Sequence, residues 1–194
     1  MRAITVFCGS ATGKRPLYRE AAEGIGRLLA RRGITLVYGG GDIGLMGRMA
    51  EAALQAGGEV IGVIPEALQA RELGHPRLTR LEVVDSMHTR KARMAELADG
   101  FIALPGGFGT FEEFCEVLTW GQLGFHKKPC GLLDVDGYYA PLQALFGQAE
   151  SEGFLQPEHR RMVCIDRDAE ALLEKMATYQ PPDVEKWLSS VRSL

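Results

Sequence analysis

Short, fully apolar runs alternate with longer amphipathic segments along the chain. The apolar runs are rich in Val, Ile, Leu and Phe and end at Gly, Pro or Asp, which is typical of strands buried on both faces. The amphipathic segments have the apolar spacing of surface helices. We expect strands at Ala3–Cys8, Ile34–Tyr38, Val60–Ile64, Leu81–Val84, Phe101–Leu104, Cys130–Leu133 and Met162–Ile165, and helices at Leu17–Arg31, Leu45–Ala56, Met87–Ala98, Phe111–Leu123, Tyr139–Glu152 and Ala169–Thr178.

This alternation of strands and helices with short connections predicts an α/β fold, a doubly wound parallel sheet with helices on both faces. We expect a single domain over residues 1–180 and a tail over 181–194, with a short helix around Trp187. The longest stretch without a regular pattern is Pro65–Arg80, which could fold over a site. Ligands of such sheets bind beyond the carboxyl ends of the strands, so the turns that follow the strands are the places to search.

Composition excludes several classes of protein. The 194 residues carry a net charge of −3, so no broad basic face for a nucleic acid polymer is expected. The four cysteines and four histidines show no metal-ligand spacing, which predicts free thiols in a reducing compartment and no bound metal. Neither a signal peptide nor an 18-residue apolar run is present, so we expect a cytoplasmic protein without a membrane segment.

The 24 glycines cluster where expected strands end. The turn Cys8–Lys14 resembles a Walker A loop, but only three residues separate its glycines and Arg15 follows its lysine. The turn Gly39–Gly44 matches the dinucleotide fingerprint, with Glu66 as the acid that would bind a ribose, although such matches arise easily in a glycine-rich chain. At the first turn a plain strand-to-helix connection is favoured, although its small residues could admit a ligand. At the second, close approach of the backbone to a ligand is favoured over a tight turn alone.

The third glycine-rich turn, Pro105–Glu113, gives the sharpest signal. A strand, a glycine turn and a helix amino terminus together direct several unpaired N–H groups at one point, where the helix dipole adds positive potential. Such a point binds a phosphate or a carboxylate. The simpler interpretation is a capping box with Thr110 as the N-cap and Glu113 reaching back. That alternative explains two residues but not the three glycines and the proline.

Positive charge for an anion comes from the expected helix that begins after Ser86. Arg90 and Lys91 flank the apolar stripe that Met87 and Met94 mark on this helix. Long cations beside a buried stripe can simply reach solvent. Here, however, the helix enters the sheet beside the third turn, where an arginine can donate a planar fork to an anionic group.

Three of these segments together resemble a known family. Met87–Lys91, Pro105–Glu113 and Thr119–Gly124 are similar to the signature motifs of the Lonely Guy (LOG) family, and the resemblance extends over residues 4–165. Members of that family are cytokinin riboside 5′-monophosphate phosphoribohydrolases, and bacterial members are often labelled lysine decarboxylases. The resemblance implies a Rossmann-like homodimer that hydrolyses the N-glycosidic bond of an N6-modified AMP, releasing the free base and ribose 5-phosphate.

The resemblance also implies which residues form the site. The family's catalytic arginine and glutamate correspond to Arg90 and Glu113, and Phe108 stands where many members have tyrosine. Glu72 and Thr119 match the family less closely than the two motifs do. The substrate-binding set that we expect is Gly9, Ser10, Gly40, Gly41, Glu72, Met87, Arg90, Lys91, Gly106, Gly107, Phe108, Gly109, Thr110, Phe111, Glu112, Glu113 and Thr119.

The chemistry fits these residues. Cleavage of the N-glycosidic bond develops positive charge on the ribose and negative charge on the departing purine. A carboxylate such as Glu113 can stabilise the first or orient water, and Arg90 can hold the phosphate or assist the leaving group. This scheme requires neither a metal nor an organic cofactor, and its partner is a small nucleoside 5′-monophosphate.

Three alternatives stay open from sequence. A decarboxylase would need pyridoxal phosphate and a Schiff-base lysine, for which Lys91 is the one candidate near the expected site. A non-catalytic nucleotide-binding or carrier protein would need the glycine turn but not both Arg90 and Glu113. An NAD(P)-dependent oxidoreductase would use the turn Gly39–Gly44.

Overall fold

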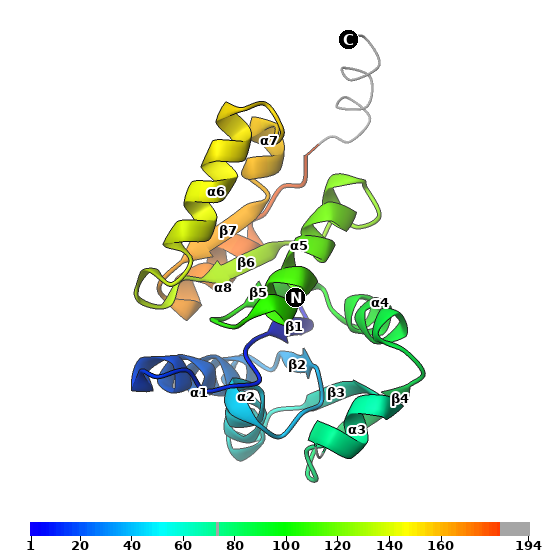
Figure 1. Ribbon diagram of the computed structural model, residues 1–194. Coiled ribbons are helices and arrows are strands. Elements are labelled where there is room, and N and C mark those ends of the chain that lie inside the picture. The colour runs from blue at the N-terminus through cyan, green and yellow to red at the C-terminus, as the bar shows by residue number, and fades with distance from the viewer. Residues whose placement is uncertain (73, 183–194) are drawn as a thin grey trace.

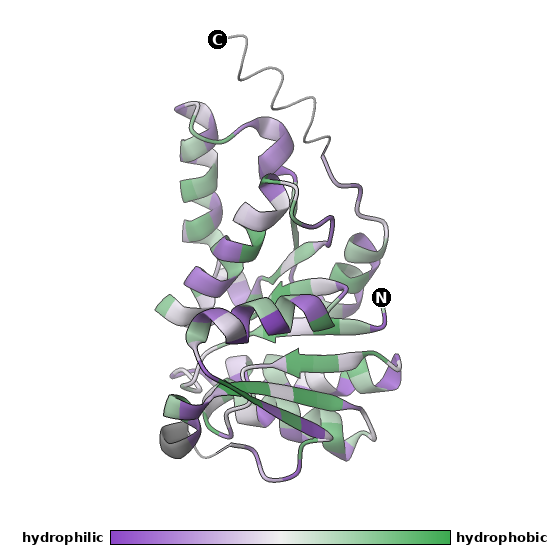
Figure 2. Cartoon of the chain, turned by 90° about the vertical axis from the view of Figure 1, so that its right-hand side faces the viewer, coloured by the Kyte–Doolittle hydropathy of each residue, from purple (hydrophilic) through white to green (hydrophobic). Residues whose placement is uncertain are grey.

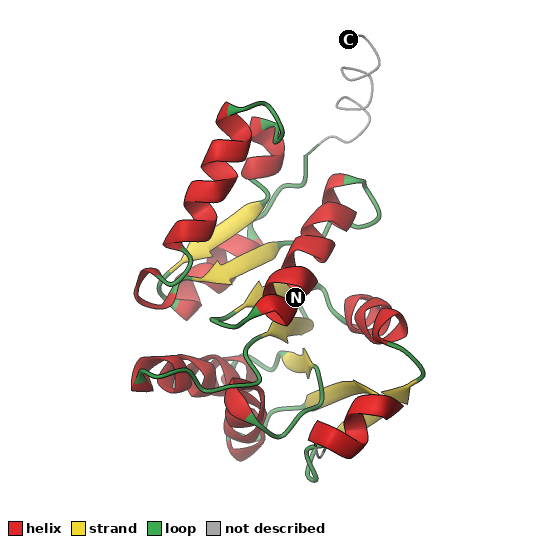
Figure 3. Ribbon diagram, viewed as in Figure 1, coloured by secondary structure: helices red, strands yellow, loops and turns green. Residues whose placement is uncertain are grey.

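The computed structural model describes residues 1–72 and 74–182, and of residues 70–72 only their place in a helix. Within these residues, the strands form one parallel sheet with helices on both sides (Figures 1 and 3). The strands are β1 (Ala3–Phe7), β2 (Thr35–Tyr38), β3 (Val60–Pro65), β4 (Arg80–Val84), β5 (Gly100–Ala103), β6 (Cys130–Leu133) and β7 (Val163–Asp166). The helices are α1 (Pro16–Arg31), α2 (Gly44–Gln55), α3 (Glu66–Glu72), α4 (Met87–Leu97), α5 (Phe108–Gln122), α6 (Ala140–Ser151), α7 (Pro157–Arg160) and α8 (Ala169–Ala177), with a 3-10 turn, η1, at Val135–Gly137.

The strand order confirms the expected doubly wound topology. It runs β4-β3-β2-β1-β5-β6-β7, and every pair is parallel. The chain therefore winds outward from β1 to β4 and then returns to the other side of β1. The loops after β1 and β5 leave in opposite directions, which opens a crevice beyond the carboxyl ends of these two strands.

Alternate residues of the strands bury two apolar layers. On β1, Ile4 and Val6 face the cluster that contains residues of α1, α2 and α8. Phe7 faces the other cluster, which contains residues of α4 and α5. Figure 2 shows the consequence, with strands mostly in the apolar colour and polar segments on the helices.

Several elements differ from the expectation. Helix α3 occupies part of the stretch expected to be irregular, Pro65–Arg80, and the short helix α7 was not expected. After α3 the chain does not cross to the third glycine turn. It pairs with the second one, because Gly74 bridges to Gly41 and the His75 amide donates to the Gly40 carbonyl at 3.1 Å. The expected helix around Trp187 lies outside the described residues. No helix in the described part of the chain combines the length and apolar character needed to cross a membrane.

Packing of α1 against α2 generates a stability prediction. A Cβ added at Gly26 would collide with the Met49 carbonyl oxygen, whereas a Cβ at Gly24, two residues earlier, would meet open space. We expect Gly26→Ala to force the helices apart and lower the free energy of unfolding by about 1–3 kcal/mol. Gly24→Ala, the matched control, should raise it by about 0.5–1 kcal/mol through helix propensity. Urea denaturation of both variants tests this, and equal effects would contradict the packing argument.

Candidate active site

The third glycine turn leads directly into α5, and the helix begins earlier than expected. Gly107 is the N-cap, no side chain caps the helix, and the Phe111 amide already donates to the Gly107 carbonyl at 3.1 Å. The capping box, the simpler alternative offered by the sequence, is therefore wrong: Thr110 is the third residue of the helix rather than its cap. Gly107 adopts the extended conformation of an N-cap residue (φ −105°, ψ −153°), and the helix begins directly after it. Glu113 consequently does not cap the helix and is available for another role.

The first helical residues of α5 face the crevice with free N–H groups. The amides of Phe108, Gly109 and Thr110 occupy the first turn of α5, where an α-helix offers no internal acceptor. Together with the helix dipole they are suited to binding an anion. This is the location that the sequence pattern predicted for a phosphate.

The first and third turns contact each other without any side chain between them. The Gly9 amide donates to the Pro105 carbonyl at 3.1 Å. A Cβ at Gly106 would overlap Thr110 Oγ1 and lie 2.9 Å from the Gly9 nitrogen, so only glycine fits there. The turn after β1 therefore forms a second wall beside the start of α5.

Two adjoining hollows lie at this crevice. One is a cleft of about 230 Å³ beside Arg90 and Glu113, and the other measures about 310 Å³ beside Tyr18 and Tyr138. Gly9, Ser10 and Gly107 line both. The cleft is lined by Cys8, Gly9, Ser10, Met46, Met87, Arg90, Gly107, Phe108, Gly109, Thr110, Glu112 and Glu113.

Arg90 lies at the bottom of the cleft with few acceptors around it. Its side chain is 8% exposed, and its Nη2 lies 3.7 Å from Glu113 Oε1. Its Nη1 donates to the sulfur of Met87 at 3.6 Å, while Nε has no hydrogen-bond partner among the described residues. Gly39 makes room for the guanidinium, because a Cβ there would overlap Nη2. A buried cation with unused donors is suited to an anionic or polar ligand.

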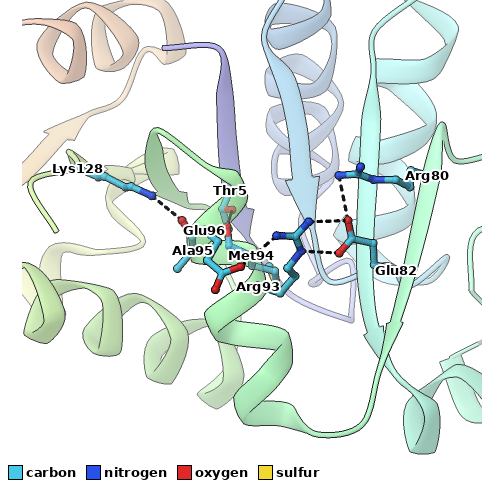
Figure 4. Close-up of polar contacts among 8 residues, drawn as sticks. All are labelled: Thr5, Arg80, Glu82, Arg93, Met94, Ala95, Glu96 and Lys128. Atoms are coloured by element: carbon cyan, nitrogen blue, oxygen red, sulfur yellow. Dashed lines mark hydrogen bonds and ion pairs between the residues drawn. The ribbon is translucent and has the colours of Figure 1, made fainter. Parts of the chain in front are cut away.

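Helix α4 is held firmly, and this fixes the position of Arg90. Figure 4 shows Arg93 donating a fork to Glu82 of β4, from Nε at 2.6 Å and from Nη2 at 3.2 Å. This guanidinium holds the pKa of Glu82 below its usual range. Near the end of α4, Thr5 Oγ1 donates to the Met94 carbonyl at 2.9 Å and Lys128 Nζ to the Ala95 carbonyl at 2.7 Å (Figure 4).

Glu113 has an unusual acidity. Burial raises its pKa from 4.5 to about 7, while Arg90 opposes this rise and the carboxylate of Glu112 adds to it. A carboxyl group with a pKa near neutrality can gain or lose a proton at physiological pH, as a general acid or base must.

Lys91 points to α5 rather than into the cleft. Its ammonium forms ion pairs with Glu112 and, at 3.0 Å, with Glu116. Burial lowers its pKa, but these two carboxylates outweigh burial and raise it above the usual value. The ion pairs tie α4 to the first turns of α5, and a direct role of Lys91 in binding substrate stays a prediction.

The other expected residues fall into two groups. Met87, Gly107, Phe108, Gly109, Thr110 and Glu112 line the cleft with Gly9 and Ser10, and Gly106 lines the adjoining hollow. Outside both lie Gly40 and Gly41, which pack on the segment before β4, and Thr119, whose hydroxyl donates to the Cys115 carbonyl at 2.8 Å. Phe111 packs edge-on against Tyr139. Glu72 ends α3, and its side chain is outside the described part of the structure.

Three residues at the site were not expected from sequence. Cys8 and Met46 line the cleft, and Gly39 accommodates Arg90. Cys8 and Met46 carry no sequence signal because they are ordinary apolar positions of a strand and a helix. Gly39 was visible as the first of three successive glycines, but its partner was not. Within the described residues, no group of three His, Cys, Asp or Glu side chains is arranged to hold a metal ion.

The raised pKa of Glu113 predicts a pH-dependent cost in stability. The unfolded chain releases this proton near pH 4.5 and the folded protein near pH 7, so stability from this group is lost as the pH rises between these values. The difference corresponds to about 3 kcal/mol above pH 7. We expect Glu113→Gln, a neutral isostere, to gain stability relative to wild type between pH 5 and pH 8. Urea denaturation at both pH values measures this.

The matched control is Glu20→Gln on the exposed side of α1. Its stability difference from wild type should change little between pH 5 and pH 8. If Glu113→Gln behaves in the same way as this control, the carboxyl is not buried as described.

Comparisons with known proteins identify relatives of this chain. A family model described as "Possible lysine decarboxylase" matches residues 46–176. A cytokinin riboside 5′-monophosphate phosphoribohydrolase of Rhodococcoides fascians is 53% identical over 173 residues, 89% of this chain and 87% of that protein. The one named LOG7 from Arabidopsis thaliana is 49% identical over 180 residues, 93% of this chain and 83% of that protein.

A solved structure shows the same fold at lower identity. The molybdenum cofactor carrier protein of Chlamydomonas reinhardtii is 22% identical, with a TM-score of 0.67 over 91% of this chain and 98% of that one. At this identity the likeness concerns the fold alone. The sequence relatives and the family model, together with the motifs that build the cleft, lead to one conclusion: this chain belongs to the Lonely Guy (LOG) family.

Proposed function

We propose that this protein is a phosphoribohydrolase that cleaves the N-glycosidic bond of AMP or N6-modified AMP, giving the free base and ribose 5-phosphate. The observation that carries this proposal is the buried pair of Arg90 and Glu113, 3.7 Å apart, beside the anion site of α5. The names of relatives that are about 50% identical support it.

The substrate would span the crevice. Its 5′-phosphate would accept hydrogen bonds from the amides at the start of α5, beside Gly9 and Ser10. This would place the ribose over Glu113, which lies in the second turn of the same helix and lines the same cleft. The base would then lie toward Met46 and Met87, the apolar residues of the cleft wall.

The reaction consumes one water molecule and needs two proton transfers, one to the departing base and one from the water. The bond from C1′ to the purine nitrogen breaks, and its electron pair leaves with the base, which then takes up a proton. Ionised Glu113 stabilises the cationic ribose and removes a proton from the water that adds to C1′. The guanidinium of Arg90, which lies beside Glu113, offsets the negative charge on the departing base.

The structure gives reasons to disfavour the two main alternatives. A Schiff-base enzyme requires a neutral lysine amine, but the carboxylates of Glu112 and Glu116 hold Lys91 in its charged form. A carrier would have no use for a carboxyl group with a pKa near 7 beside a buried arginine.

Assembly as a homodimer in the cytoplasm is part of the same proposal. Large apolar side chains are exposed around α4 and α5, where Phe108 is 92% and Phe125 76% exposed, together with Met87 and Leu123. Exposed apolar groups of this kind are typical of surfaces that a partner covers.

An assay of substrate analogues tests the activity. Incubation with AMP, isopentenyl-AMP and their unphosphorylated ribosides, followed by chromatography, should release free base from the two phosphorylated compounds in preference.

The value of kcat/KM should rise with pH through an apparent pKa near 7, because Glu113 acts in its ionised form. Glu113→Gln and Arg90→Met should lower kcat by about 100-fold or more while the proteins stay folded and Glu113→Gln still binds AMP. Unchanged turnover in Glu113→Gln would refute the catalytic assignment.

Light scattering coupled to size exclusion tests the assembly. A homodimer has twice the chain mass of 21.2 kDa. We expect this mass across a dilution series at neutral pH. A mass of one chain at all concentrations would contradict the proposed dimer.

A further inference from the structure

The carbonyl groups of the third glycine turn accept hydrogen bonds from other parts of the protein. Four consecutive carbonyls, from Leu104 to Gly107, accept hydrogen bonds from four different donors. Two of these donors are amides and two are hydroxyls of adjacent tyrosines. In chain order the bonds run from Tyr139 Oη to Leu104 at 2.6 Å, from the Gly9 amide to Pro105 at 3.1 Å, from Tyr138 Oη to Gly106 at 2.5 Å and from the Phe111 amide to Gly107 at 3.1 Å.

This arrangement matters for an anion because carbonyl oxygens repel it. In a short turn the peptide planes can rotate, and each rotation exchanges an N–H group for a carbonyl oxygen on the surface of the turn. The hydroxyls of Tyr138 and Tyr139 hold the carbonyls of Gly106 and Leu104 against the protein interior. The N–H of Gly107, which belongs to the same peptide as the Gly106 carbonyl, is thereby kept facing the crevice, with no cost of reorganisation when an anion binds. The Leu104 carbonyl precedes Pro105, which has no N–H, so the bond from Tyr139 instead fixes the point where the turn leaves β5.

The two tyrosines are themselves fixed in place. They follow η1, where the Tyr139 amide donates to the buried carboxylate of Asp134 at 2.8 Å. The ring of Tyr139 packs edge-on against Phe111 of α5, and the ring of Tyr138 packs edge-on against Tyr18. Tyr139 is buried and Tyr138 is half-buried. The two hydroxyls are therefore supplied by a well-restrained turn after β6, which lies later in the chain than the glycine turn.

We propose that Tyr138 and Tyr139 are positioning residues that determine the preference for a 5′-phosphorylated substrate. They touch neither the base nor the reacting carbon, and they act by orienting the turn from Leu104 to Gly107. This inference rests on the proposed function in one respect, that the 5′-phosphate binds at the start of α5. It predicts that loss of either hydroxyl lowers the affinity for the phosphate group and leaves the affinity for the nucleoside unchanged.

The test uses Tyr138→Phe and Tyr139→Phe, which keep the rings and remove the hydroxyls. Binding of ribose 5-phosphate and of adenosine is measured by calorimetry, and KM and kcat for AMP are measured in parallel. We expect the dissociation constant of ribose 5-phosphate and the KM for AMP to rise about three- to tenfold per hydroxyl, the usual worth of one hydrogen bond. The affinity for adenosine and the value of kcat should stay within about twofold, because no group at the reacting carbon is altered.

Tyr38→Phe is the matched control. Its hydroxyl is also buried on the sheet but has no hydrogen-bond partner in the described part of the chain, so its loss should leave all four constants unchanged. If Tyr139→Phe does not fold, the half-buried Tyr138→Phe decides alone.

Two outcomes would overturn the inference. One is an unchanged affinity for ribose 5-phosphate in folded Tyr138→Phe, and the other is an equal loss of affinity for adenosine and ribose 5-phosphate. Failure of the proposed function is separate, since it would appear as absent turnover of AMP by the wild-type protein.

Discussion

The functional site depends on one steric condition, the direct backbone contact between the turns after β1 and β5. Gly106 has no room for a side chain because Thr110 and the Gly9 amide occupy the space where its Cβ would be. This contact brings the start of α5 to the switch point of the sheet. Without it, the free amides of α5 and the small residues of the first turn would not line one cleft. A residue with a side chain at this position would push the start of α5 away from the turn after β1.

The electrostatics of the cleft follow from burial more than from net charge. Arg90 and Glu113 are both nearly inaccessible to solvent, and the guanidinium does not fully compensate the loss of water around the carboxylate. The protein therefore carries a stability cost at neutral pH at the residue proposed to do the chemistry. Such costs are typical of functional sites, where a perturbed acidity serves catalysis rather than folding.

Much of the rest of the structure restrains the elements that carry these groups. Arg93, Thr5 and Lys128 anchor α4, and Lys91 links α4 to α5 through two carboxylates. Tyr138 and Tyr139 restrain the turn that precedes α5. Arg90 and Glu113 thus come from two helices whose relative position is set by polar contacts, as a preorganised site requires.

The amino-acid sequence by itself determined the alternation of strands and helices, the parallel doubly wound sheet and the glycine turn that leads from β5 into a helix. These features are local, since they depend on apolar periodicity and on glycine at strand ends. Tertiary structure alone decided that α5 begins at Phe108, so that Glu113 faces the cleft instead of capping the helix. It also decided that Arg90 enters the cleft beside Gly39 while its neighbour Lys91 pairs with α5. The physical reason is that the direction of a side chain, its burial and its acidity depend on residues far along the chain, which a local pattern does not place.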